Sequence, residues 1–108
     1  MQKKIPKNSK VVVLGGGIAG CSVAYHLAKL GWQDTILIER DQLTSGTTWH
    51  AAGLVGQLGA TATITKLRKY SLSLYKELEK KTGLSTGLKQ NGAITVASTP
   101  ERLQELLR

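Results

Sequence analysis

Two short stretches of the chain hold the residue types best suited to binding a ligand. The first is GGGIAG, residues 15–20, and the second is TSGTTWHAAG, residues 44–53. Glycine-rich turns let backbone N–H groups approach a ligand closely, and such groups often bind phosphates. The second stretch sets one histidine and one tryptophan among hydroxyl-bearing and small side chains. No Ser-His-Asp set, carboxylate pair or metal-ligand cluster accompanies them, so hydrolytic and metal chemistry lack support.

The first stretch satisfies the pattern G-x-G-x-x-G of dinucleotide-binding units. In such units each glycine has its own task. Gly15 would allow a tight turn after a strand, Gly17 would let a pyrophosphate approach the backbone, and Gly20 would let the following helix pack on the sheet. The first N–H groups of that helix, including those of Ile18 and Ala19, would face the phosphates.

An acidic residue stands where such a unit needs one. Glu39 closes the second expected strand, nineteen residues beyond Gly20, and its carboxylate can accept hydrogen bonds from the ribose hydroxyls of an adenosine. A carboxylate there would repel the additional phosphate of NADP, so the ligand is NAD or FAD. The alternative is an incidental glycine-rich turn with a surface glutamate. Arg40 lies near the adenine or ribose, or is simply exposed.

The hydroxyl-rich loop favours FAD over NAD. In FAD enzymes the chain that follows this strand often runs back along the dinucleotide, so hydroxyl groups can donate to the phosphates or the ribityl chain. Small residues would let the backbone approach the flavin. Trp49 either packs under the flavin or fills the domain core. The hydroxyl-bearing and small residues expected at the cofactor are Ser45, Thr47, Thr48, Ala51, Ala52 and Gly53.

A β-α-β unit is needed to position these residues. The β-branched run at residues 10–14, KVVVL, predicts a strand buried on both faces of a parallel sheet. Apolar residues recur at helical spacing from 18 to 30, with Gly31 at the C-terminal cap. Residues 35–38 predict a second, parallel strand. The expected fold class is α/β, with a Rossmann-like unit in which Cys21 and His26 have structural roles.

Three further elements are predicted in the second half of the chain. Residues 62–81 predict an amphipathic helix ending near Gly83, and residues 93–97 predict a strand. Thr99 as N-cap and Pro100 at the first helical position open a last helix. Because that helix has only begun at Arg108, we expect a truncated domain. Residues 1–9 form a basic tail, and residues 10–108 form the N-terminal part of an FAD-binding domain whose remainder is missing.

Composition narrows the classes of partner. Fifteen basic residues against seven acidic ones give a formal charge of +8, yet no nucleic-acid recognition motif accompanies them. The apolar runs are too short to span a membrane. A single cysteine excludes an internal disulfide and fits a reducing compartment. The first nine residues lack the apolar segment of a secretory signal, which predicts a cytoplasmic protein, or a mitochondrial matrix protein in a eukaryote.

Three segments resemble a known family of flavoproteins. VVVLGGGIAGCSVAYHLAKLGW, LIERDQLTSGTTWHAAGLVGQL and TGLSTGLKQNGAITVASTPERLQEL are similar to the N-terminal part of the sarcosine and dimethylglycine dehydrogenases, in the D-amino-acid-oxidase-like superfamily. The resemblance covers nearly all of the chain from Lys10 onward, and SGTTWHAAG is its most specific motif. It implies FAD joined covalently to the histidine of the T-W-H motif, which is His50 here. The alternative is a loop histidine that packs against the flavin or caps a backbone carbonyl.

The resemblance also implies a reaction and its partners. It implies oxidation of an N-methylated glycine by hydride transfer to the flavin, with tetrahydrofolate and an electron-transferring flavoprotein as partners of regions outside this sequence. It implies no catalytic residue within these 108 residues. Three alternatives stay open: a non-enzymatic FAD-binding relative with a regulatory or scaffold role, an inactive fragment, and an NAD-dependent dehydrogenase domain.

Overall fold

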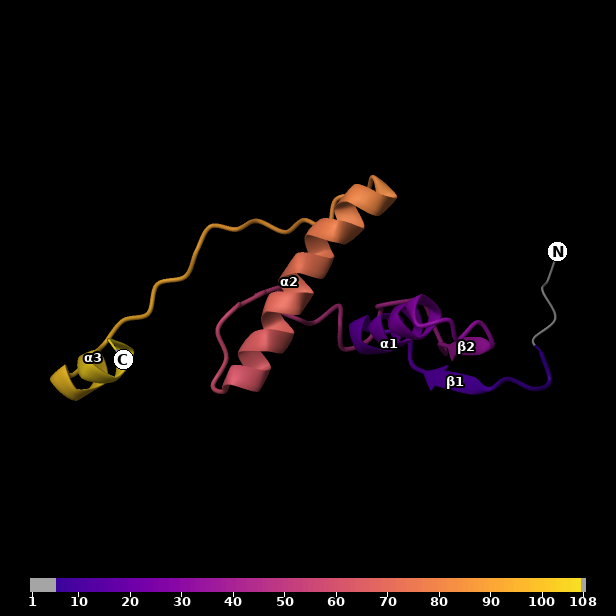
Figure 1. The fold of residues 1–108 in the computed structure, drawn as a ribbon, viewed down its shortest axis with the longest axis horizontal. Coiled ribbons are helices and arrows are strands. Elements are labelled where there is room, and N and C mark those ends of the chain that lie inside the picture. Colours follow the sequence, from indigo (N-terminus) through magenta and orange to yellow (C-terminus); the bar gives the residue numbers. More distant parts are fainter. Residues whose placement is uncertain (1–5, 108) are drawn as a thin grey trace. The chain divides into compact units, whose positions relative to one another are not determined.

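A computed structural model describes residues 6–107 of the chain. The chain divides into two compact units, Met1–Gly53 and Leu54–Arg108. Figure 1 shows their elements, with β1, α1 and β2 in the first unit and α2 and α3 in the second. In the described part of the chain, every helix is too short or too polar to cross a bilayer.

The first unit is the predicted β-α-β arrangement. Strands β1 (Val11–Leu14) and β2 (Thr35–Ile38) form a parallel two-stranded sheet, in which Val11 pairs with Thr35 and Leu14 with Ile38. The connecting helix α1 (Ile18–Lys29) packs against both strands. β-branched residues suit the strands because their side chains pack well on a pleated surface. The α/β fold class with a parallel sheet is confirmed.

Glycine ends α1 in the predicted way. Leu30 is the C-cap and Gly31 follows it at φ +88°. The N–H of Gly31 donates to the carbonyl of Ala28 at 3.0 Å, and the N–H of Trp32 donates to that of Leu27 at 2.9 Å. This pair of bonds is a Schellman motif, which satisfies the last carbonyls of the helix and turns the chain towards β2.

The expectation that the first strand is buried on both faces is wrong for the described residues. Val12 and Leu14 are 50% and 78% exposed, whereas Val11 and Val13 are half-buried. The reason is that α1 lies on only one face of the sheet. A Cβ built on Gly20 of that helix would lie 3.5 Å from Cγ1 of Val13. Alternate side chains of a strand point to opposite faces, so Val12 and Leu14 lie on the uncovered face.

The second unit contains the predicted amphipathic helix and the short helix near the C-terminus. Helix α2 (Ala62–Thr82) starts where the hydroxyl of Thr61 accepts from the N–H of Ile64 at 3.2 Å, and it ends at Gly83 with φ +69°. Helix α3 (Pro100–Leu106) has the predicted Thr99 cap, which accepts from the N–H of Arg102 at 3.2 Å. Both helices therefore begin with the local hydrogen bond that satisfies a free N–H group.

The segment that precedes α2 is tied to that helix. The N–H of Gly59 donates to Oγ1 of Thr65 at 3.0 Å, and the Arg68 guanidinium donates to the carbonyl oxygen of Leu58. A cavity of about 420 Å³ lies beside these contacts and is lined by Leu54, Val55, Gly56, Arg68, Ser71 and Tyr75.

The predicted strand over residues 93–97 is not formed. The structure assigns no strand to these residues, and Ile94 and Val96 are 94% and 81% exposed. A strand requires a neighbour to receive its backbone hydrogen bonds, and within residues 6–107 only β1 and β2 pair with each other. The alternating apolar pattern therefore has no sheet to join in the described chain.

Candidate dinucleotide-binding site

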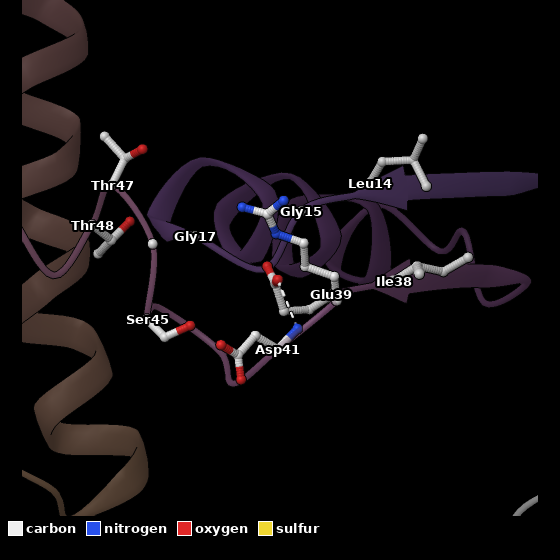
Figure 2. Close-up of a pocket in the computed structure, with 11 residues that line it drawn as sticks. Leu14, Gly15, Gly17, Ile38, Glu39, Asp41, Ser45, Thr47 and Thr48 are labelled. Atoms are coloured by element: carbon white, nitrogen blue, oxygen red, sulfur yellow. Dashed lines mark hydrogen bonds between the residues drawn. The ribbon is translucent and has the colours of Figure 1, made fainter.

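A pocket of about 530 Å³ opens at the carboxyl ends of β1 and β2, entirely within the first unit. Ligands of open parallel sheets bind outside these strand ends. The pocket brings together seven of the residues singled out from the sequence. These are Gly15, Gly17, Glu39, Arg40, Ser45, Thr47 and Thr48, and the remaining lining residues are Leu14, Ile38, Asp41 and Gly46 (Figure 2).

The glycine-rich turn is built as tightly as its sequence pattern suggests. Gly15 has φ +97°, a conformation that L side chains rarely adopt, and its N–H donates to the carbonyl of Ile38 at 2.8 Å. A Cβ on Gly17 would lie 2.9 Å from Oγ1 of Thr48. A Cβ on Gly20 would collide with the carbonyl oxygen of Gly15. Side chains at these positions would therefore displace the turn or the loop beside it.

Glu39 binds the backbone of the glycine-rich turn. Its Oε2 accepts from the N–H of Gly16 at 2.6 Å, and its Oε1 accepts from the N–H of Asp41 at 3.1 Å, a bond drawn as a dashed line in Figure 2. The Gly16 N–H, followed by that of Asp41, lowers the pKa of the Glu39 carboxyl from its ordinary value. The group is consequently an anion at neutral pH, with lone pairs left to accept from a ligand hydroxyl.

Thr48 caps α1 from the loop. The N-cap residue Gly17 has no side chain, and Oγ1 of Thr48 accepts from the N–H of Ile18 at 2.9 Å instead. This contact joins residues 30 positions apart in the chain. The sequence predicts that the Thr48 hydroxyl donates to a ligand, and its capping of α1 was not predicted. A glycine at the N-cap position was the available signal, because it leaves the first N–H groups of a helix without a local acceptor.

A second contact fastens the same loop to the turn. The N–H of Thr44 donates to the carbonyl of Gly16 at 2.9 Å. Thr44 has φ +67° and, among the described residues, is the one non-glycine residue with a positive φ. A positive φ is unfavourable for a β-branched residue. The hydroxyl of Ser45 donates within the loop, to the carbonyl of Gln42 at 2.8 Å. The carbonyl of Gly16 thus accepts one hydrogen bond from the loop, its N–H donates one to Glu39, and the residue is buried.

Several predicted residues lie outside the lining of this pocket. Trp49 is 78% exposed, so its interpretation as a core residue is wrong, while packing under a flavin stays a prediction. The His50 side chain is also exposed, and no backbone carbonyl within residues 6–107 accepts a hydrogen bond from it. The other predicted residues that do not line the pocket are Ile18, Ala19, Gly20, Ala51, Ala52 and Gly53.

Cys21 and His26 have local contacts on α1. The Cys21 thiol is half-buried and donates to the carbonyl oxygen of Gly16 at 3.4 Å. Nδ1 of His26 lies 2.7 Å from the carbonyl oxygen of Ser22, and its ring meets that of Tyr25 edge-on at 5.2 Å. Both contacts agree with structural roles. Among residues 6–107, the His, Cys, Asp and Glu side chains form no group of three or more that could hold a metal ion.

Comparison with known proteins places this geometry in a wider group. The model of the family described as "DAO: FAD dependent oxidoreductase" matches residues 10–108. The chain is 48% identical to a 4-methylaminobutanoate oxidase (formaldehyde-forming) of Paenarthrobacter nicotinovorans, over 95% of this chain and 12% of that protein. It is 47% identical to the mitochondrial sarcosine dehydrogenase of Homo sapiens, over 98% of this chain and 12% of that protein.

One curated relative has a different kind of name. The chain is 43% identical to the mitochondrial pyruvate dehydrogenase phosphatase regulatory subunit of Mus musculus, over 96% of this chain and 12% of that protein. The chain thus spans about an eighth of the length of these curated relatives.

A solved structure has the same fold. The glycine oxidase of Bacillus cereus ATCC 14579 superposes with a TM-score of 0.67 at 29% sequence identity, over 93% of this chain and 29% of that one. The family model names FAD, which is the cofactor class that the pocket suggests. The chain belongs to the DAO family of FAD-dependent oxidoreductases.

Proposed function

We propose that this chain is the FAD-binding segment of an amine dehydrogenase that oxidises N-methylated glycines, sarcosine or dimethylglycine. The observation that carries the proposal is the pocket at the ends of β1 and β2, where an ionised Glu39 and the hydroxyl-rich loop converge on the glycine-rich turn. High identity to a sarcosine dehydrogenase and to a 4-methylaminobutanoate oxidase supports an N-methylated amine as the substrate class.

The pocket has the features that an adenine dinucleotide needs. Gly15 and Gly17 leave the backbone of the turn accessible, because they carry no side chain. Gly15 has a positive φ that L side chains rarely adopt, and a Cβ on Gly17 would lie 2.9 Å from Oγ1 of Thr48. The Glu39 carboxylate is suited to accept from the ribose hydroxyls. The N–H groups at the start of α1 are suited to the pyrophosphate, except that of Ile18, which Thr48 caps. Ser45, Thr47 and Thr48 line the pocket on the loop side and supply hydroxyl groups.

His50 is the proposed point of covalent attachment to the flavin. Its side chain is exposed, next to the exposed Trp49, so nothing in the described chain shields the imidazole. A neutral imidazole nitrogen is a nucleophile near pH 7. Bound FAD would supply the acceptor for the hydride that leaves the N-methyl carbon of the substrate. The residues described here would bind and orient the cofactor, and none of them is assigned a catalytic proton transfer.

The partners and the compartment are part of the same proposal. Tetrahydrofolate and an electron-transferring flavoprotein would serve the whole protein, as acceptors of the one-carbon product and of the electrons. The protein would act in the cytoplasm, or in the mitochondrial matrix in a eukaryote. The word "mitochondrial" in the names of the human and mouse relatives supports the second location.

A regulatory role without catalysis is the second candidate. The observation that favours it is the 43% identity to a regulatory subunit of pyruvate dehydrogenase phosphatase. Such a protein would use the same pocket to hold FAD, or to hold a protein partner, without turning over an amine. An NAD-dependent dehydrogenase domain is the third candidate, and FAD-dependence of the family argues against it.

One experiment separates the candidates. The protein is purified, and its intact mass and visible spectrum are measured before and after acid precipitation, followed by anaerobic mixing with sarcosine or dimethylglycine. A mass increase of one FAD, colour that stays in the pellet and bleaching by either amine would support the amine dehydrogenase. Flavin that neither amine bleaches would favour the regulatory role. Binding of NAD without flavin absorbance would refute both.

A further inference from the structure

The hydroxyl of one loop residue lies where helix α1 would hold a phosphate. Oγ1 of Thr48 is 2.9 Å from the backbone nitrogen of Ile18 and accepts a hydrogen bond from its N–H. The same oxygen lies in the space above Gly17, because a Cβ built on Gly17 would come within 2.9 Å of it. Figure 2 shows Thr48 on the loop beside Gly17. One oxygen atom therefore occupies both the first N–H of the helix and the space that the glycine leaves open.

A phosphate oxygen of a bound dinucleotide would need the same position. Hydrogen bonds from a backbone N–H to an oxygen have a donor–acceptor distance of about 2.9 Å, whichever oxygen accepts. The N–H groups at the start of a helix are the usual phosphate donors of such units, and the second glycine of the motif is where the pyrophosphate approaches the backbone. Because two oxygen atoms cannot occupy one position, the Ile18 N–H can bind Thr48 or a phosphate, but not both at once.

Other contacts hold the loop that carries Thr48 against the glycine-rich turn. The N–H of Thr44 donates to the carbonyl of Gly16 at 2.9 Å. Thr44 has φ +67°, a conformation that costs free energy in a β-branched residue and persists only where the surroundings enforce it. The N–H of Ala51 donates to the carbonyl of Thr48 at 3.2 Å. The path of the loop thus places the Thr48 hydroxyl at the start of α1.

We propose that Thr48 is a built-in competitor of the cofactor phosphate for the N–H of Ile18. This inference rests on the proposed function, and it assigns Thr48 a role opposite to that of a donor to the cofactor. Phosphate oxygens carry negative charge, so they accept from the start of a helix more strongly than a neutral hydroxyl does. Thr48 consequently leaves the N–H when a phosphate binds, and the hydrogen bond that it loses lowers the affinity for the dinucleotide.

A cooperative role for the hydroxyl is the alternative. A threonine hydroxyl can accept one hydrogen bond and donate another, so Thr48 would cap Ile18 and also donate its proton to a phosphate. The phosphate would then have to lie beyond Oγ1, outside the space above Gly17 that this oxygen already fills. The short distance between that oxygen and the Cβ position of Gly17 favours competition. The two roles predict opposite effects on affinity when the hydroxyl is removed.

The test measures how two ligands bind when the Thr48 hydroxyl is removed. Every protein carries His50→Ala, so that flavin is held reversibly and can be removed before titration. The variants added to this parent are Thr48→Val, Thr48→Ala, Thr48→Ser and Thr47→Val. Thr47 is the matched control, because its side chain also lines the pocket and, within residues 6–107, its hydroxyl caps no helix. The probes are ADP, which has the pyrophosphate, and adenosine, which does not. Isothermal titration calorimetry gives each Kd.

We expect Thr48→Val to bind ADP about fivefold more tightly than the parent, since the cap that ADP must otherwise replace is worth about that factor. Thr48→Ser keeps the hydroxyl and should match the parent, and Thr47→Val should bind ADP no more tightly than the parent. Adenosine should bind Thr48→Val and the parent equally, because it has no phosphate for the N–H of Ile18. Circular dichroism checks that each variant folds, and Thr48→Ala gives the same comparison if Thr48→Val loses its helices.

Equal or weaker binding of ADP by the variants that lack the hydroxyl would overturn the proposal. Weaker binding would show that Thr48 donates to the phosphate, and equal binding would show that the phosphate does not use the N–H of Ile18. Adenosine that binds more tightly together with ADP would also overturn it, because a looser pocket would explain both. Failure of the parent to bind ADP would remove the dinucleotide site and the proposed function with it. ADP binding that loss of the hydroxyl does not tighten would refute the competition alone.

Discussion

The carboxylate of Glu39 accepts a hydrogen bond of 2.6 Å from the backbone N–H of Gly16, a residue 23 positions earlier in the chain. This bond connects the end of β2 to the turn that leaves β1. It explains why an acid belongs at this strand end even before a ligand is considered. The same carboxylate thus fixes the glycine-rich turn and faces the pocket in which we place the adenosine ribose.

The Glu39 bond predicts a pH-dependent contribution to stability. Folding lowers the pKa of Glu39, first through the Gly16 N–H and then through that of Asp41. A group with a lowered pKa contributes stability above its unfolded pKa, about 4.3 for glutamate, and loses it as the pH falls through the folded value. The wild type should therefore be more stable than Glu39→Gln at pH 7, and the difference should shrink below about pH 4.

Urea unfolding of both proteins at pH 7 and pH 3 measures this difference. Glu79 and Glu101 also have lowered pKa values, each through hydrogen bonds of its own, so both proteins lose stability in acid. Comparing the two proteins removes that shared background. A difference that is the same at both pH values would show that the ionised form of Glu39 is not what binds Gly16.

The cap that Thr48 provides to α1 can be tested by removing its hydroxyl. Thr48→Val keeps the shape of the side chain and leaves the N–H of Ile18 without its acceptor. Loss of an N-terminal cap costs about 1 kcal/mol, and we expect the free energy of unfolding to fall by this amount. Thr48→Ser retains the hydroxyl and should stay within about 0.5 kcal/mol of the wild type. If the valine variant and the wild type unfolded at the same urea concentration, water would satisfy the N–H of Ile18 as well as the threonine hydroxyl does.

Local patterns predicted the first unit well, and long-range contacts explain what they missed. The β-branched runs of β1 and β2 and the helical spacing of α1 are properties of neighbouring residues, and each element lies where it was predicted. The bond from Gly16 to Glu39 and that from Ile18 to Thr48 depend on the path of the loop in space. No periodicity in the sequence encodes such a path.

The predicted strand over residues 93–97 failed for a related reason. The alternation of apolar and polar residues in Ala93-Ile-Thr-Val-Ala97 is typical of a half-buried strand. A strand forms, however, only when a neighbouring strand pairs with its backbone through hydrogen bonds. With Ile94 and Val96 almost fully exposed, the segment is extended chain. The Thr99 cap was predicted from the sequence, whereas the local Thr61 cap of α2 and the distant Thr48 cap of α1 were not.

Close packing of the turn predicts that alanine destabilises the protein at one glycine and has little effect at another. In Gly20→Ala the new methyl group meets the carbonyl oxygen of Gly15, a backbone atom that cannot move without opening the turn. We expect a loss of about 1–3 kcal/mol in the free energy of unfolding. Gly46→Ala is the control, because nothing lies within 4 Å of its Cβ position and its φ is not positive. Thermal unfolding should separate the two variants by several degrees, and similar midpoints would contradict the packing described here.

His50 supplies the sharpest test of how the cofactor is held. In His50→Ala the glycine-rich turn, Glu39 and the pocket hydroxyls are untouched, since the His50 side chain does not line the pocket. We therefore expect reversible FAD binding to persist while all flavin becomes extractable with acid. His26→Ala removes the other histidine of the chain, which bonds within α1 and lies outside the pocket lining, so it is the matched control and should keep its flavin in the acid pellet. Flavin that still precipitates with His50→Ala would move the covalent bond to another residue, and flavin absent from both the variant and the wild type would remove the cofactor from the proposal.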